Sequence, residues 1–189
     1  MDVSEAIEKR RAYRSLAPVE ITDETVEELT RAAQLAPSCF NNQPARFVFV
    51  RDKAMLGRMH EVLSSGNGWA KAASMIVAVF CEKENDCVIK DREYYLFDTG
   101  LAVGQLVLRA TELGLVAHPI AGYSPRKTRE ALGIPKQAQV ITLVIVGKHA
   151  EDISPVLSEK QVESERERPE RLPMGKVAYM DRYPSPDGQ

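Results

Sequence analysis

Two uninterrupted apolar runs, residues 75–81 (MIVAVFC) and 140–146 (VITLVIV), constrain the fold of this 189-residue chain more than any other feature. Short apolar runs of this kind, rich in β-branched residues and free of charge, are typical of strands whose two faces are both buried. We therefore expect the first run to be a central strand of a sheet.

Helical periodicity marks the segments that can cover this sheet. Apolar spacing, capping residues and glycine or proline stops predict helices at 3–11, 23–35, 55–63, 92–113 and 125–132. Shorter strands are expected at 46–50 and 115–120. Because some strands adjoin without a crossover helix, the pattern predicts an α+β fold with a mixed, mainly antiparallel sheet flanked by helices.

The polarity of the chain changes near residue 154. Residues 1–153 are expected to form a single core, which is the natural size for one domain. Residues 154–183 are dense in charge and have too few apolar side chains to fold alone, so we expect a C-terminal segment that completes the same domain. Residues 184–189 are expected to be a flexible tail.

Charge and cysteine content limit the possible partners. With 25 Lys and Arg against 27 Asp and Glu, no overall field favours nucleic acid or an anionic membrane. The N-terminus lacks the apolar run of a signal peptide, and no apolar stretch reaches membrane-spanning length. No cysteine pair has zinc-site or thioredoxin-like spacing, so we expect a reducing, cytoplasmic setting; the cysteines are Cys39, Cys81 and Cys87.

Several common kinds of site are absent from the sequence. It contains no dinucleotide-binding GxGxxG, no Walker A loop, no GxSxG and no HExxH. No metal site is expected, because the histidines lie far apart and none has a partner at ligand spacing; they are His60, His118 and His149.

Three segments could contribute to a binding site. Arg10 and Arg14 would share a helix face, where an anion would relieve their repulsion, although a solvated basic helix end explains them as well. Residues 37–44 (PSCFNNQP) form a loop longer than a simple turn needs. Residues 118–122 (HPIAG) end a strand with a glycine that lets backbone approach a ligand, or simply form a turn.

Together and in this order, these segments resemble the nitroreductase (FMN-dependent oxidoreductase) family from about residue 4 to residue 183. Residues 10–14 (RRAYR) are similar to the family's RRSxR, 36–44 to its APSxxNxQP, and 118–122 to its PxxG turn. The resemblance implies an interlocked homodimer with an FMN at each interface. The positions that it assigns to FMN are Arg10, Arg11, Ala12, Arg14, Pro37, Ser38, Cys39, Asn41, Gln43, Asn67, Pro119, Ile120, Ala121, Gly122, Arg168 and Arg171.

The resemblance also implies roles within that set. Arg10 would bind the FMN phosphate, together with Arg171 before Leu-Pro, and Arg14 would bind the pyrimidine edge. Gly122 would offer its N–H to flavin N5. The partner subunit would supply four residues of the 36–44 segment, namely Pro37, Ser38, Cys39 and Asn41.

The implied activity is ping-pong oxidoreduction. NADH or NADPH would give hydride to FMN, which would pass electrons to a nitroaromatic, a quinone or a similar small acceptor. Ala12, Ala45 and Ala121 depart from the family's usual residues, which leaves the acceptor open. The alternatives are dehalogenating or flavin-fragmenting chemistry, a flavin carrier without turnover, and an interaction domain whose arginines are merely solvated.

Overall fold

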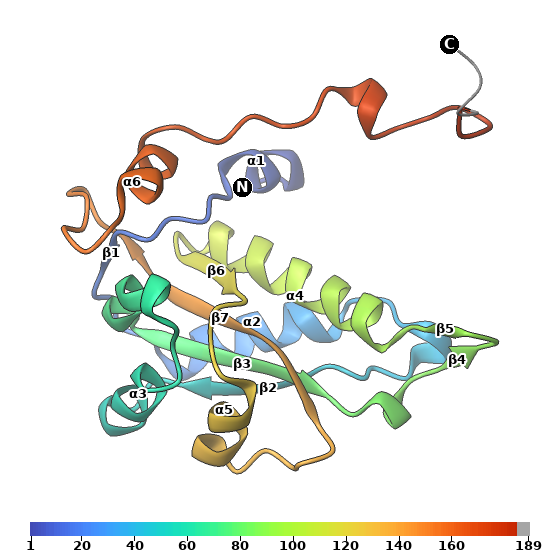
Figure 1. Ribbon diagram of the computed structural model, residues 1–189, viewed down its shortest axis with the longest axis horizontal. Coiled ribbons are helices and arrows are strands. Elements are labelled where there is room, and N and C mark those ends of the chain that lie inside the picture. Colours follow the sequence, from blue (N-terminus) through green and yellow to red (C-terminus); the bar gives the residue numbers. More distant parts are fainter. Residues whose placement is uncertain (185–189) are drawn as a thin grey trace.

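The computed structural model describes residues 1–184 and has an α+β fold built on one antiparallel sheet (Figure 1). Strands β2 (Arg46–Val50), β3 (Met75–Cys81) and β7 (Gln139–His149) are consecutive neighbours. Strands β6 (Val116–Ile120) and β1 (Leu16–Ala17) both pair with β7. The α+β class and the mainly antiparallel sheet are confirmed, and every strand pair between residues 1 and 184 is antiparallel.

Helices cover both faces of the sheet because β3 and β7 are apolar on both sides. Helices α2 (Asp23–Gln34) and α4 (Tyr95–Glu112) pack on the face that contains Met75, Val77 and Val79. Helices α3 (Lys53–His60) and α5 (Pro125–Leu132), with the 3-10 segment η2 (Ser65–Ala72), cover the face of Ile76 and Ala78. The expected central position of the 75–81 run is thus confirmed.

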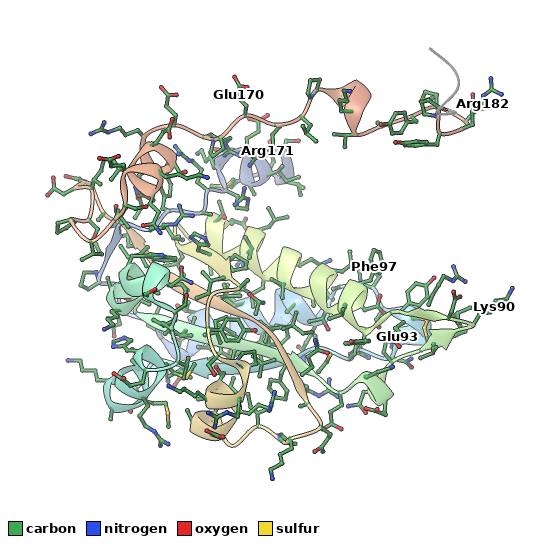
Figure 2. All side chains as sticks on the ribbon, viewed as in Figure 1. Lys90, Glu93, Phe97, Glu170, Arg171 and Arg182 are labelled. Atoms are coloured by element: carbon green, nitrogen blue, oxygen red, sulfur yellow. A yellow bond between two sulfur atoms is a disulfide. The ribbon has the colours of Figure 1, made fainter. Side chains whose placement is uncertain are left out.

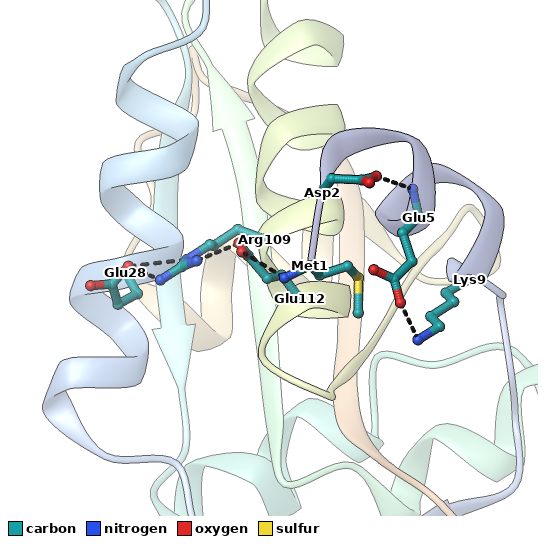
Figure 3. Close-up of polar contacts among 7 residues, drawn as sticks. All are labelled: Met1, Asp2, Glu5, Lys9, Glu28, Arg109 and Glu112. Carbon is teal, nitrogen blue, oxygen red and sulfur yellow. Dashed lines mark hydrogen bonds and ion pairs between the residues drawn. The ribbon is translucent and has the colours of Figure 1, made fainter.

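The N-terminal helix α1 (Val3–Lys9) lies beside α4 and is held by charged contacts (Figure 3). Arg109 of α4 binds Glu28 of α2, with 2.6 Å between Nη2 and Oε2, and also binds Glu112. The amino group of Met1 lies 4.0 Å from the other Glu112 oxygen. This arrangement places the residues that follow α1 on the surface next to the end of β7.

Helix α6 (Glu159–Arg166) and the 3-10 turn η4 (Met174–Lys176) occupy the charge-dense C-terminal segment. Beyond α6 the chain passes α1 and then extends away from the body, as the red ribbon in Figure 1 shows. Apolar side chains are left exposed along this extension, which we call the arm (residues 172–183); they are Leu172, Met174, Val177, Tyr179, Met180 and Tyr183.

The expected strands at 46–50 and 75–81 have the observed bounds, whereas other boundaries moved. Residues 92 and 93 form strand β5 (Arg92–Glu93), paired with β4 (Val88–Ile89), so the long helix begins later than expected. The division at residue 153 stays a prediction, and the expected flexible tail lies, from residue 185 on, outside the described residues. Within residues 1–184 no helix has the length and apolarity needed to cross a membrane.

Candidate functional site

A small surface pocket of about 140 Å³ gathers arginines from both ends of the chain. No acidic side chain lines it. Burial, followed by the positive charges of Arg168 and Arg171, lowers the pKa of Arg10. Such crowding of like charge is unfavourable until an anion neutralises it, so the pocket suits a phosphate or a similar group. Its lining residues are Arg10, Arg11, Ala12, Arg14, Ser164, Arg168, Pro169 and Arg171.

The arginines of this pocket are not equivalent. The Arg11 guanidinium donates to the Ser164 carbonyl (2.8 Å) and lies over the Tyr13 ring. Arg168 donates to the carbonyls of Glu8 and Arg10.

By contrast, the guanidinium groups of Arg10 and Arg14 donate to no acceptor in the described chain, and Arg171 donates only to the Pro169 carbonyl (2.6 Å). Figure 2 shows Arg171 on the side of the chain that faces α1, while Glu170 points away. Arg10, Arg14 and Arg171 are therefore the groups with donors available to an anion.

Glu165 of α6 fixes this arginine segment from beneath. Its side chain is 2 % exposed, and its two carboxylate oxygens accept the backbone N–H groups of Arg14 (2.5 Å) and Ser15 (3.2 Å). A buried carboxylate with these two partners holds the main chain at Arg14 in place. Sequence reasoning missed Glu165, because nothing in the SERERPER run distinguishes one buried acid from its exposed neighbours.

A chain of contacts links Arg14 to the glycine turn after β6. The Arg14 guanidinium lies 6.0 Å from the centre of the Trp69 ring. The Trp69 indole N–H donates to Asn67 Oδ1 (3.2 Å), and the Asn67 amide donates to the Gly122 carbonyl (2.9 Å). Arg14, Asn67 and Gly122 are thus linked by a chain of contacts through the buried Trp69, although they are distant in the sequence.

The turn at Gly122 is closely covered by two polar side chains. A Cβ at this position would lie 2.4 Å from Asn67 Nδ2 and from Ser64 Oγ, so a larger residue would have to displace both of these side chains. Its carbonyl also accepts the Ser64 N–H at 3.0 Å. Pro119 and Ala121 are exposed, whereas the Ile120 side chain is buried in the core, so only the main chain of Ile120 can face a ligand.

His118 lies beside Trp69 as a neutral base. Its Nδ1 is 3.1 Å from the Tyr13 carbonyl, which requires the ring to donate from Nδ1, and its ring packs 4.8 Å from Trp69. Burial and, to a smaller extent, the charge of Arg14 lower the pKa of His118 to about 4. The hydrogen bond to the Tyr13 carbonyl opposes this shift. His118 therefore supports the tryptophan without adding charge near Arg14.

The loop at residues 37–44 lies elsewhere in the same chain. It follows α2 and adjoins the β4–β5 hairpin, at the end of α4 away from α6 (Figure 1). Two cavities that include loop residues share no lining residue with the arginine pocket. Within one chain the structure therefore brings together the sites assigned at both termini and at 118–122, but not those assigned at Pro37, Ser38, Cys39, Asn41 and Gln43.

The structure also pairs two cysteines that lie far apart in the sequence. Cys39 and Cys87 form a disulfide with a Cα–Cα distance of 6.2 Å across 48 residues, while Cys81 is free and buried. The short spacings that indicate zinc sites or thioredoxin-like motifs cannot reveal a cysteine pair so far apart. The expectation of a reducing setting had relied on that spacing, and the disulfide removes this support.

Comparison with known proteins agrees with the geometry. The family description "Nitroreductase family" matches residues 7–73 and 59–148. A protein of Archaeoglobus fulgidus, named for NADH dehydrogenase/NAD(P)H nitroreductase activity, is 33 % identical over 143 residues, or 73 % of this chain and 80 % of its own.

Two further relatives carry the flavin in their names. An FMN reductase [NAD(P)H] of Bacillus subtilis is 25 % identical over 168 residues, covering 79 % of this chain and 67 % of its own. A solved oxidoreductase structure containing FMN is 28 % identical, with a TM-score of 0.84 and coverage of 100 % of this chain and 95 % of that one. Family match, relatives and fold agree, and the chain belongs to the nitroreductase family.

Proposed function

We propose that this protein is an FMN-dependent NAD(P)H oxidoreductase that reduces a nitroaromatic, a quinone or a similar small acceptor by ping-pong turnover. Membership of the nitroreductase family, with relatives named as NAD(P)H nitroreductase and FMN reductase, supports the flavin and the nicotinamide donor. The observation that carries the proposal is the arginine pocket, in which the guanidinium groups of Arg10 and Arg14 have no hydrogen-bond acceptor among residues 1–184.

The residues present fit the phosphate of FMN. A phosphate presents several acceptor oxygens and a double negative charge, and Arg10 and Arg171 offer donors from opposite sides of one pocket. Ala12, which replaces the usual serine, removes one hydroxyl donor but leaves these cations in place. Arg11 and Arg168 would act mainly by fixing the main chain, because their guanidinium groups already bind carbonyls.

The surface from Arg14 to Gly122 fits the ring of the flavin. Arg14 would bind the pyrimidine edge, where its fixed charge favours the negative charge of the reduced ring. Gly122 would donate its N–H, which has no acceptor within residues 1–184, while Asn67 holds the opposite side of that residue. When bound, FMN supplies the chemistry by taking hydride from the nicotinamide and passing electrons to the acceptor.

A second copy of the chain would complete this site. The 37–44 loop lies away from the arginine pocket of its own chain, so Pro37, Ser38, Cys39 and Asn41 could contact the flavin only from a partner subunit. The arm supports a homodimer because it exposes apolar side chains that residues 1–184 do not cover, such as Met180 at 85 %. A cytoplasmic location remains part of the proposal.

The absorption spectrum of the purified protein tests the proposal. We expect a yellow protein with flavin absorbance that bleaches on anaerobic addition of NADH or NADPH and returns when an acceptor is added. A colourless protein that cannot take up FMN would refute it. Bound FMN without steady-state nicotinamide oxidation would instead identify a flavin carrier, and product analysis after reduction would reveal dehalogenation or flavin fragmentation.

A further inference from the structure

The Cys39–Cys87 disulfide has no part in the proposed electron transfer, yet it connects two segments that are far apart in the sequence. It joins the 37–44 loop to the residue that precedes strand β4. Both cysteines are half-buried, and Cys39 lines an apolar surface cavity of about 490 Å³ with Phe40 and Phe97. A small reductant can therefore reach this bridge, whereas Cys81 is fully buried.

Two buried carboxyl groups hold the main chain on either side of the bridge. Asp98 accepts the Cys39 N–H at 2.6 Å, and Asp86 accepts the Cys87 N–H at 2.8 Å. Burial, and then the nearby charge of Asp86, raises the pKa of Asp98. The second oxygen of Asp86 is buried without a partner among the described residues.

The loop that the disulfide restrains has an unfavourable backbone. Phe40, Asn41 and Gln43 have φ angles of 49°, 59° and 50°, in the left-handed region that residues with a Cβ seldom adopt. Such a conformation persists only where the surroundings hold it. Besides the disulfide, hydrogen bonds restrain the loop, among them the Asp98 contact, the bond from the Gln43 N–H to Ser38 Oγ (2.9 Å) and the bond from the Asn42 amide to Asp86 (3.3 Å).

We propose that Cys39 and Cys87 form a reversible thiol–disulfide site that fixes the 37–44 loop when oxidised and releases it when reduced, with a small thiol such as glutathione as exchange partner. One reductant thiolate attacks a sulfur of the bridge, the S–S bond breaks, and the released cysteine takes a proton. A second thiolate then attacks the reductant sulfur of the mixed disulfide. Both cysteines end as thiols, and the two reductant sulfurs are joined.

The consequence of this switch for the enzyme rests on the proposed function. If the loop of one subunit contacts the flavin of the other, reduction of the bridge loosens one wall of the cofactor site. The cytoplasmic location belongs to the proposed function, and in such a reducing compartment a disulfide is expected to be transient and regulatory. The switch itself does not require flavin, so it can be tested without it.

Thiol labelling of the folded protein, with no flavin added, tests the exchange. After oxidised glutathione, we expect native N-ethylmaleimide labelling to add nothing to the intact mass; after excess reduced glutathione, it should add two labels. The Cys81→Ala variant should behave identically, because the buried thiol is not the one labelled. Two labels after the oxidised treatment would overturn the proposal.

Limited chymotrypsin digestion tests the release of the loop. Phe40 is 82 % exposed, and cleavage after it requires the loop to open. We expect cleavage to be about tenfold faster in the reduced protein, since proteolysis follows the open population. Cys87→Ser should cleave at this faster rate in either condition, whereas Cys81→Ala should follow the wild type. An unchanged rate on reduction of the wild type would overturn the proposal, whether or not the protein binds FMN.

Discussion

Neighbouring arginines in this protein have different roles, which depend on the hydrogen-bond acceptors that their guanidinium groups contact. Arg11 and Arg168 are bound to carbonyls, so they hold the N-terminal segment against α6. The Arg10 guanidinium has no acceptor within residues 1–184, and its lowered pKa reflects burial among other cations. The free donors of Arg10 and Arg14 are what make the pocket suitable for an anion.

Replacing Arg10 with alanine should weaken FMN binding without unfolding the protein. Loss of a hydrogen bond to a charged group costs about 1.5–3 kcal/mol, so we expect roughly tenfold to hundredfold weaker affinity. Quenching of FMN fluorescence on titration measures it. Arg126→Ala is a matched control, because that side chain is 69 % exposed and pairs only with Glu130 on α5. Equal affinity in both variants would remove Arg10 from the site.

The neutral state of His118 should make stability depend on pH. Because its pKa is lowered from 6.5 to about 4 on folding, the unfolded chain takes up the proton first as pH falls. We expect stability to be fully present above pH 6.5 and to decline towards pH 4, by about 3 kcal/mol at most. Urea unfolding across this range measures it. A His118→Gln variant should lose most of the decline; the same decline in that variant would refute the assignment.

Helix α6 links the C-terminal segment to the candidate site. The side chains of Ser158 and Gln161 form a reciprocal capping box at its start, and Glu165 on its buried face holds the main chain at Arg14. Without α6 the arginine segment would lose its fixed position.

Removing the cap of α6 should therefore affect both stability and the site. We expect Ser158→Ala to cost about 1 kcal/mol of unfolding free energy and to weaken FMN binding a few-fold, because Glu165 becomes less well placed. Thermal denaturation and the FMN titration measure these effects. Ser158→Asp retains a capping oxygen and should behave as the wild type. An equal loss in both variants would show that the cap is not the cause.

Helices and strands were predicted well from the sequence where a short stretch of residues carried the signal. The apolar runs and the Ser124 and Gly133 boundaries gave β2, β3 and α5 almost to the residue. Strands β4 and β5 were missed because two residues are too few to show alternation. Helix α6 was also missed, although the Ser158–Gln161 spacing of a capping box was present in the sequence.

The candidate site was predictable only through the family resemblance. Neither charge nor spacing decided between a solvated Arg10 and an anion ligand, since the answer depends on Arg168 and Arg171 from the other end of the chain. The roles of Glu165, His118 and the Cys39–Cys87 pair could not be predicted from the sequence, because they arise from burial and from contacts between distant residues. The shared pocket of Arg10 and Arg171 passes one geometrical test of the flavin hypothesis, while the residue roles remain predictions.

The whole molecule presents an arm that its own body does not cover. Large apolar side chains on it are 40–85 % exposed, whereas burying each would stabilise an assembly by about 1.5–3 kcal/mol. Arg171, which lines the arginine pocket, directly precedes the arm, so the arm leaves the body beside that pocket.

Deleting residues 172–189 should weaken the proposed homodimer while leaving the fold of one chain intact. We expect sedimentation at micromolar concentration to shift from two chains towards one, because the deletion removes the apolar side chains of the arm that the partner would cover. Removal of residues 185–189 alone is the control and should leave the dimer unchanged. A dimer that persists after the longer deletion would show that the arm does not hold it.

The pocket that joins Arg10 to Arg171 has a consequence for biosynthesis. Arg10 is synthesised before every strand of the sheet, whereas Arg171 is synthesised after the last of them. Glu165, which fixes the same segment, also follows the sheet. The anion pocket therefore cannot form until the sheet has been made, and a prematurely terminated product that retains the whole sheet would still lack it.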